Sequence, residues 1–199
     1  MNGSNPAEDL AVVRRLMEEA RDLAWQHGKH FVVWGIIGTA ALLLTYAHLT
    51  GGAQLPVGAV WSAALIIGWA FSAWVGWRDR RRARLRTIAG RMLGGIWLGF
   101  GVTASLIAVL ALYTSALAGE LLGGLMAALL GFGFFASSFV GRQGWLRGLA
   151  LGWWGGAVAL FLWPGPHTLP LLAGLLLVFQ VAPGLVIHLR GRRMEGSAA

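Results

Sequence analysis

The stretch Trp77–Arg91, WRDRRRARLRTIAGR, carries seven arginines and one aspartate between two long apolar runs. Short loops rich in Lys and Arg stay on the cytoplasmic side of a membrane, whereas neutral and acidic loops cross it. This stretch therefore sets the orientation expected of the whole chain. Its net charge of +6 exceeds what orientation requires, which also predicts contacts with anionic lipid headgroups or an acidic partner. The arginines are Arg78, Arg80, Arg81, Arg82, Arg84, Arg86 and Arg91.

The composition is that of a polytopic membrane protein. Of 199 residues, 57% are hydrophobic and only 12% are charged, about half the charged share of a soluble domain. The net charge is +8, but the basic residues adjoin apolar runs of membrane-spanning length, so they indicate topology and we expect no nucleic-acid partner. The chain has no cysteine, which excludes disulfides, thiolate metal sites and cysteine nucleophiles.

Six apolar runs follow the N-terminal region, each near the twenty residues that a helix needs to cross a bilayer. They predict an all-α fold of six transmembrane helices, arranged as three hairpins within a bundle of residues 30–190. With these spans all sixteen Lys and Arg residues fall on one side, so both termini, including a tail at 191–199, are expected in the cytoplasm. The predicted spans are 31–50, 56–77, 92–114, 120–140, 145–163 and 169–189.

Residues 1–29 are predicted to form a separate cytoplasmic unit, an amphipathic helix over Asn5–His27. Its apolar residues fall within about half of the helical wheel, and its charges fall in the other half. The polar half mixes both signs of charge, whereas a helix that binds anionic lipid has a mainly basic face. Docking against the bundle or against a partner protein is therefore expected of this helix.

Small residues recur every fourth position in the fourth and fifth predicted spans. In a bilayer, small residues at this spacing let two helices approach closely. They predict close packing within the bundle, with homodimerisation through one of these faces as the alternative. The residues are Gly123, Ala127 and Gly131 in the fourth span and Gly148, Gly152 and Gly156 in the fifth.

Gln180 is the most notable polar residue predicted to lie inside the membrane. It precedes Pro183, and a proline in a helix leaves a backbone carbonyl one turn earlier without its usual donor. The main interpretation is a kink in the last helix that local groups repair. The alternative is a small-ligand or gating site around Gln180.

Four histidines lie toward the two ends of the first and last predicted spans. If those helices are neighbours, the histidines form two pairs, the layout of six-helix b-type cytochromes with two haems. Interfacial solvation explains the same positions, and we expect no cofactor and no metal site. The residues are His30 and His48 in the first span, and His167 and His188 around the last.

The segment Arg14–Gly35, RRLMEEARDLAWQHGKHFVVWG, is followed by paired apolar runs and a C-terminal arginine stop. In these features the chain resembles a family of small, uncharacterised six-helix inner-membrane proteins of bacteria, often encoded beside winged-helix regulators or permease components. The resemblance implies a location in the bacterial inner membrane and a cytoplasmic partner. It transfers no functional residues.

No catalytic motif is present, so we expect a protein that is not an enzyme. The leading hypothesis is an interaction or regulatory protein whose basic cytoplasmic face docks a soluble partner or a membrane subunit. The alternative is a transporter or permease-like subunit for a small or lipophilic substrate, since six spans and a basic loop after the second span resemble exporter permeases. A haem protein is the third possibility.

Overall fold

The computed structural model describes residues 6–81, 88–114, 119–140, 143–187 and 189, with side chains for all of these except 6–27, 79–81 and 88. The described residues form helices and turns and contain no strand. A π-helical turn, η1, follows α6, and the helix then continues to residue 187. The elements are α1 (Pro6–Leu49), α2 (Val57–Arg81), α3 (Ile88–Tyr113), α4 (Gly119–Val140), α5 (Trp145–Leu162), α6 (Thr168–Leu176) and η1 (Leu177–Val181).

Six stretches are long and apolar enough to cross a membrane, which confirms the predicted all-α class and the number of apolar helices in the described part of the chain. Each boundary lies within three residues of its predicted position. The stretches are Gly28–Leu49, Val57–Arg78, Ala89–Tyr113, Gly119–Val140, Trp145–Leu162 and Thr168–Ile187.

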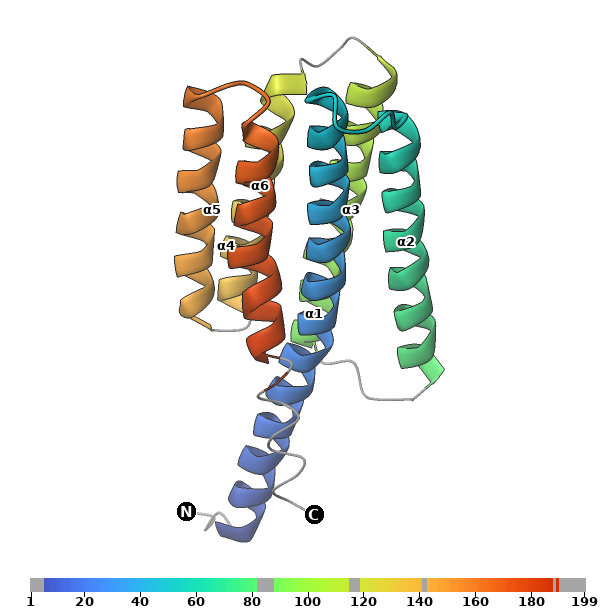
Figure 1. Cartoon of the computed structure of the whole chain (residues 1–199). Coiled ribbons are helices and arrows are strands. Elements are labelled where there is room, and N and C mark those ends of the chain that lie inside the picture. The colour runs from blue at the N-terminus through green and yellow to red at the C-terminus, as the bar shows by residue number, and fades with distance from the viewer. Residues whose placement is uncertain (1–5, 82–87, 115–118, 141–142, 188, 190–199) are drawn as a thin grey trace.

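Helix α1 is a single helix of 44 residues, where the sequence predicted two separate segments. It passes through residues 28–30 without a break, because one glycine in a helix interior costs only about 1 kcal/mol and residues 6–49 contain no proline after Pro6. Figure 1 shows the N-terminal half of α1 extending beyond the ends of the other helices instead of folding back on them. The side chains of residues 6–27 lie outside the described part, so their amphipathic arrangement stays a prediction.

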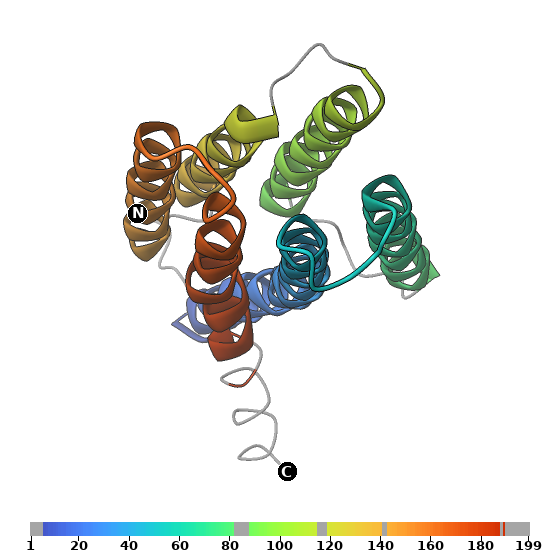
Figure 2. The same cartoon turned by 45° about the horizontal axis from the view of Figure 1, so that its top comes forward.

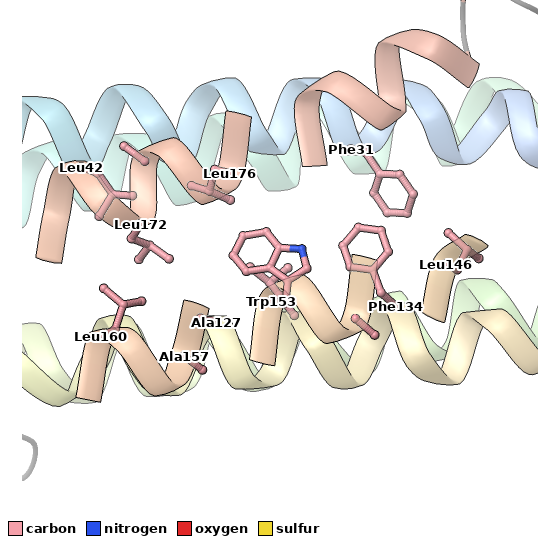
Figure 3. Packing of buried hydrophobic residues seen from close by; sticks show 13 residues of the cluster. Phe31, Leu42, Ala127, Phe134, Leu146, Trp153, Ala157, Leu160, Leu172 and Leu176 are labelled. Carbon is pink, nitrogen blue, oxygen red and sulfur yellow. The ribbon is translucent and has the colours of Figure 1, made fainter. Parts of the chain in front are cut away.

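The helices pack unevenly (Figure 2). The most extensive contacts join α4 to α5 and α1 to α6, whereas α2 and α3 touch each other little and bury few residues. The predicted grouping into three hairpins therefore stays a prediction, since the closest packing runs across it. Figure 3 shows the indole of Trp153 in the middle of the core, with Leu160 and Leu172 on one side and Phe31 and Phe134 on the other.

Three tryptophans join successive helices by the same contact. Each indole lies against a glycine of the next helix, and its Nε1 donates a hydrogen bond to a serine one turn further along. The glycine makes room for the ring, and the serine provides an acceptor that the apolar surroundings lack. The three sets are Trp34 with Gly68 and Ser72, Trp69 with Gly101 and Ser105, and Trp97 with Gly133 and Ser137, with Nε1–Oγ distances of 3.0, 3.0 and 3.1 Å.

Candidate functional site

Helix α1 crosses the helix that continues α6 over residues 182–187, and this crossing, here called the α1–α6 crossing, is built on two glycines. A Cβ atom on Gly184 would lie 2.9 Å from the carbonyl oxygen of Gly28, and a Cβ on Gly28 would lie 3.0 Å from the carbonyl oxygen of Gly184. Such a close approach of two backbones requires the absence of side chains at both positions. It brings the carbonyl of Phe31, less than one turn beyond Gly28, within reach of a polar side chain on the other helix.

That side chain is Gln180, which is only 5% exposed. Its Nε2 donates a hydrogen bond to the carbonyl oxygen of Phe31 at 3.3 Å, and its Oε1 is buried with no hydrogen-bond partner among the described residues. Gln180 lies in η1, where the N–H of Ala182 donates to the carbonyl of Leu177, five residues earlier. The π-helical turn ends two residues before Pro183, which cannot donate a backbone hydrogen bond. The proline is thus accommodated by a widened turn that directs Gln180 toward α1.

Two further buried polar atoms in the described bundle lack a hydrogen-bond partner, Thr39 Oγ1 of α1 and Trp153 Nε1 of α5. Thr39 follows Gly35 by one turn, and a Cβ on Gly35 would meet Gln180 and Val181. The ring of Trp153 lies 6.2 Å from that of Phe179, the residue before Gln180. All these groups are neutral, so the site offers hydrogen bonds and no acid, base or nucleophile. Within the described ranges no group of three or more His, Asp or Glu side chains is placed to hold a metal ion.

The histidines predicted as a haem alternative make separate local contacts. The ring of His30 meets Phe71 of α2 edge-on at 5.5 Å. Nδ1 of His48 lies 3.2 Å from the carbonyl oxygen of Ala53 in the following turn, and Nε2 of His167 lies 2.9 Å from that of Trp163. His188 lies outside the described residues. Although α1 and α6 are neighbours, no described contact joins His48 to His167, and the haem hypothesis gains no support from these placements.

The basic residues that the structure describes lie at one end of the bundle, where α2 ends and α3 and α5 begin (Figure 1). Arg78, Arg91 and Arg147 are exposed. The guanidinium of Arg78 lies 5.6 Å from the ring centre of Trp74, and that of Arg147 lies 5.0 Å from the ring centre of Phe139. The side chains of Arg80 and Arg81, and all of Arg82, Arg84 and Arg86, lie outside the described part, so their predicted partner or lipid contacts stay predictions.

The small residues predicted for helix packing fall into two groups. Gly131, Gly152 and Gly156 each receive a large side chain from a neighbouring helix, and Ala127 is fully buried. Gly123 makes only ordinary contacts, and a side chain at Gly148 would enter open space. At these three glycines the neighbouring helix contributes a side chain to the contact. The side chains are Trp154 on Gly131, Phe179 on Gly152 and Leu175 on Gly156.

Sequence reasoning missed the glycines that set the α1–α6 crossing and the pairing of tryptophans with serines. The pairing of tryptophans with serines did leave a pattern in the sequence, because glycine precedes serine by four residues in GWAFS, GVTAS and GFFAS. The α1–α6 crossing left no such repeated pattern, because Gly28 and Gly184 are single residues and only the folded structure shows that they contact each other. Thr39 and Trp153 as unpaired polar groups were likewise not predicted.

Replacing Gln180 by methionine is expected to change the free energy of unfolding by less than about 1 kcal/mol, because the change removes one long hydrogen bond and also an unpaired buried acceptor. Gln180→Glu is expected to cost about 2 kcal/mol or more, because it leaves a buried carboxyl group without a donor. Unfolding by sodium dodecyl sulfate in mixed micelles measures both. A loss of about 2 kcal/mol or more in Gln180→Met would show that Oε1 has a partner in the native protein.

Comparison of the chain with protein-family models, with curated proteins and with solved structures found no match.

Proposed function

We propose that the chain is a non-enzymatic protein of the bacterial inner membrane, with both termini in the cytoplasm, whose cytoplasmic end docks a soluble protein or a neighbouring membrane subunit. The observation that carries this proposal is the continuity of α1 beyond the bundle (Figure 1). At 1.5 Å per residue, residues 6–27 extend the helix by about 33 Å. A rigid helix of this length holds a partner at a fixed place relative to the bundle.

The sequence of this part of α1 suits a protein partner better than a lipid surface. Residues 6–27 contain five acidic and three basic residues, so the segment carries a net negative charge and is repelled by anionic headgroups. Apolar residues recur along it at helical spacing, which is typical of a helix that binds another helix or a groove. A partner with an apolar groove and flanking charges of both signs fits this pattern.

The proposed orientation follows from the described basic residues. Lys29, Arg78, Arg91 and Arg147 all belong to the end of the bundle from which α1 extends, and the only described charged side chain at the other end is Glu120. Basic residues flanking apolar helices are retained in the cytoplasm. The proposal therefore places the extension of α1 in the cytoplasm.

Removing residues 1–27 is expected to abolish capture of the partner while leaving the bundle folded, because the deleted part lies beyond the other helices. Crosslinking in native membranes, followed by affinity purification of the full-length and shortened chains, measures this. A protein enriched with the full chain and lost from the shortened chain supports the proposal. Identical sets of captured proteins, with both chains equally abundant and monodisperse, would refute it.

A second candidate, a transporter or permease-like subunit for a small or lipophilic substrate, is favoured by the site at Gln180. π-Helical turns occur frequently at functional sites, and here one holds a buried, unpaired amide oxygen in the bundle. On this proposal Gln180→Met abolishes substrate flux in reconstituted vesicles without altering stability. On the docking proposal, wild type and variant show the same flux as empty vesicles.

A further inference from the structure

The C-terminal end of α4 and the start of α5 line a pocket that the docking proposal does not use. The pocket is open to the outside, has a volume of about 420 Å³ and is lined by Ser138, Phe139, Gly144 and Arg147. It lies at the end of the bundle that carries the basic residues, where α4 ends at Val140 and α5 begins at Trp145. These helix ends mark the level where hydrocarbon gives way to headgroups, and the exposed Trp145 suits that level.

The lining of the pocket divides into a charged part and an apolar part. The guanidinium of Arg147 is exposed and is held 5.0 Å from the ring centre of Phe139, so its position is restricted. The ring of Phe139 is itself 58% exposed and packs edge-on against Phe135 at 5.0 Å. An arginine beside an exposed aromatic ring presents donors for an anion next to a surface for a hydrocarbon chain.

The remaining lining residues leave the pocket accessible. Gly144 adopts right-handed helical angles, φ −57° and ψ −30°, and a Cβ atom placed on it would meet nothing within 4 Å. The hydroxyl of Ser138 donates to the carbonyl oxygen of Phe135 at 2.7 Å, so its proton is already used in a hydrogen bond within α4. Among the described lining residues Arg147 is thus the one charged group, and none of these residues offers a carboxylate that would compete with an anion for it.

We propose that this pocket binds the phosphate group of an anionic phospholipid, with Arg147 donating hydrogen bonds to the phosphate oxygens and Phe139 contacting the first methylene groups of an acyl chain. Arginine is well suited to phosphate because its planar guanidinium offers paired donors. A free phosphate presents the same oxygens but has no chain to contact Phe139. The proposal rests on the proposed cytoplasmic orientation of Arg147, and it does not depend on the partner of α1.

Native mass spectrometry of the full chain in mild detergent tests this, with phosphatidylglycerol and zwitterionic phosphatidylcholine as probes. We expect one phosphatidylglycerol to bind at least about tenfold more tightly than phosphatidylcholine, because the trimethylammonium group of phosphatidylcholine offsets the charge of its phosphate and repels the guanidinium. Arg147→Gln is expected to remove this preference. Arg78→Gln is the matched control, because Arg78 also lies over an aromatic ring, that of Trp74, but lines no part of this pocket. It is expected to retain the lipid bound in the pocket, because the lipid contact predicted for Arg78 lies at the end of α2, outside the pocket lining.

Gly144→Asp provides a second variant that leaves Arg147 in place. The new carboxylate has open space, lies three residues before Arg147 on one helical turn and neutralises it as an ion pair. An acidic residue at a helix start also stabilises the helix, so the fold is expected to persist. This variant should lose the preference for phosphatidylglycerol as Arg147→Gln does.

The outcomes separate the possible sources of the phosphate. Displacement of phosphatidylglycerol by excess inorganic phosphate, with a phosphate adduct that needs Arg147, assigns the pocket to a free phosphate group. Retention of the lipid under the same conditions assigns it to the headgroup. Equal lipid binding in wild type and Arg147→Gln, or an equal loss in Arg78→Gln, would overturn the proposal. Crosslinked partners of Arg147→Gln should match those of wild type, so failure here is distinct from failure of docking through α1.

Discussion

Replacing Gly184 by alanine is expected to destabilise the bundle by about 3 kcal/mol, at the upper end of the range for overpacked sites. The added Cβ atom would lie 2.9 Å from the carbonyl oxygen of Gly28, 3.0 Å from Cγ2 of Val32 and 3.1 Å from Cβ of Phe31. Two of these atoms belong to backbone or Cβ positions that no change of rotamer can move. The helix that follows α6 must therefore move away from α1, which also lengthens the hydrogen bond from Gln180 to Phe31.

Gly174→Ala is the matched control in α6. A Cβ atom at Gly174 meets nothing within 4 Å, and alanine favours a helix over glycine by about 1 kcal/mol, so stability is expected to stay equal or to rise. The midpoint of unfolding by sodium dodecyl sulfate measures both variants. Should Gly184→Ala prove as stable as Gly174→Ala, the close crossing of α1 and α6 would be wrong, and with it the geometry of the Gln180 site.

The limits of the six apolar helices were predictable because charge and hydropathy change sharply at them. Arg78 ends the second apolar stretch, and Trp145 begins the fifth shortly after Arg142. These boundaries depend on the local cost of burying a charge, which the sequence alone conveys. The continuity of α1 was not predictable in this way, because a polar segment and an apolar segment form one helix as readily as two.

The sequence could indicate that helices pack through small residues, but it could not indicate which residues contact each other. The spacing of small residues indicated helix packing, yet Gly131 and Gly148 belong to the same predicted pattern, and only Gly131 lies against a neighbour. Spacing identifies a face of a helix, whereas the neighbour that covers the face depends on the arrangement of the whole bundle. For the same reason the partner of Gln180 could not be predicted, because the Phe31 carbonyl lies 149 residues away in the sequence.

The large aromatic side chains explain why glycine is needed at the positions that do make contact. In a bilayer, burying an aliphatic side chain between helices gains little over burying it in lipid, so association depends on close packing and hydrogen bonds. A tryptophan ring that lies against a glycine of the neighbouring helix supplies both, because the ring packs against the backbone and its Nε1 reaches an acceptor. Trp154 does this between α5 and α4, where Nε1 donates to the carbonyl oxygen of Ala128 at 3.3 Å.

Gly131→Ala is expected to cost about 1–3 kcal/mol, because the added methyl group overlaps the indole of Trp154 and forces it outward. The displacement breaks the hydrogen bond to Ala128 and disturbs the contact with Phe135, whose ring centre lies 5.3 Å from that of Trp154. The effect should be large because α4 and α5 share the most extensive interface in the described bundle. Loss of stability in mixed micelles, with a shift of tryptophan emission, measures it.

Gly148→Ala belongs to the same small-residue pattern and serves as the control, since a Cβ atom at Gly148 has nothing within 4 Å. It is expected to unfold at the same detergent fraction as wild type or slightly above it, because alanine is the better helix former. A different result would arise if the pattern as a whole formed a dimer interface. Both substitutions would then weaken self-association, and Gly148→Ala would shift the oligomeric state while the monomer stayed as stable as wild type. Sedimentation in detergent matched to the solvent density distinguishes a dimer interface from packing within one chain. If wild type is monomeric and only Gly131→Ala is destabilised, the small residues serve packing within one chain.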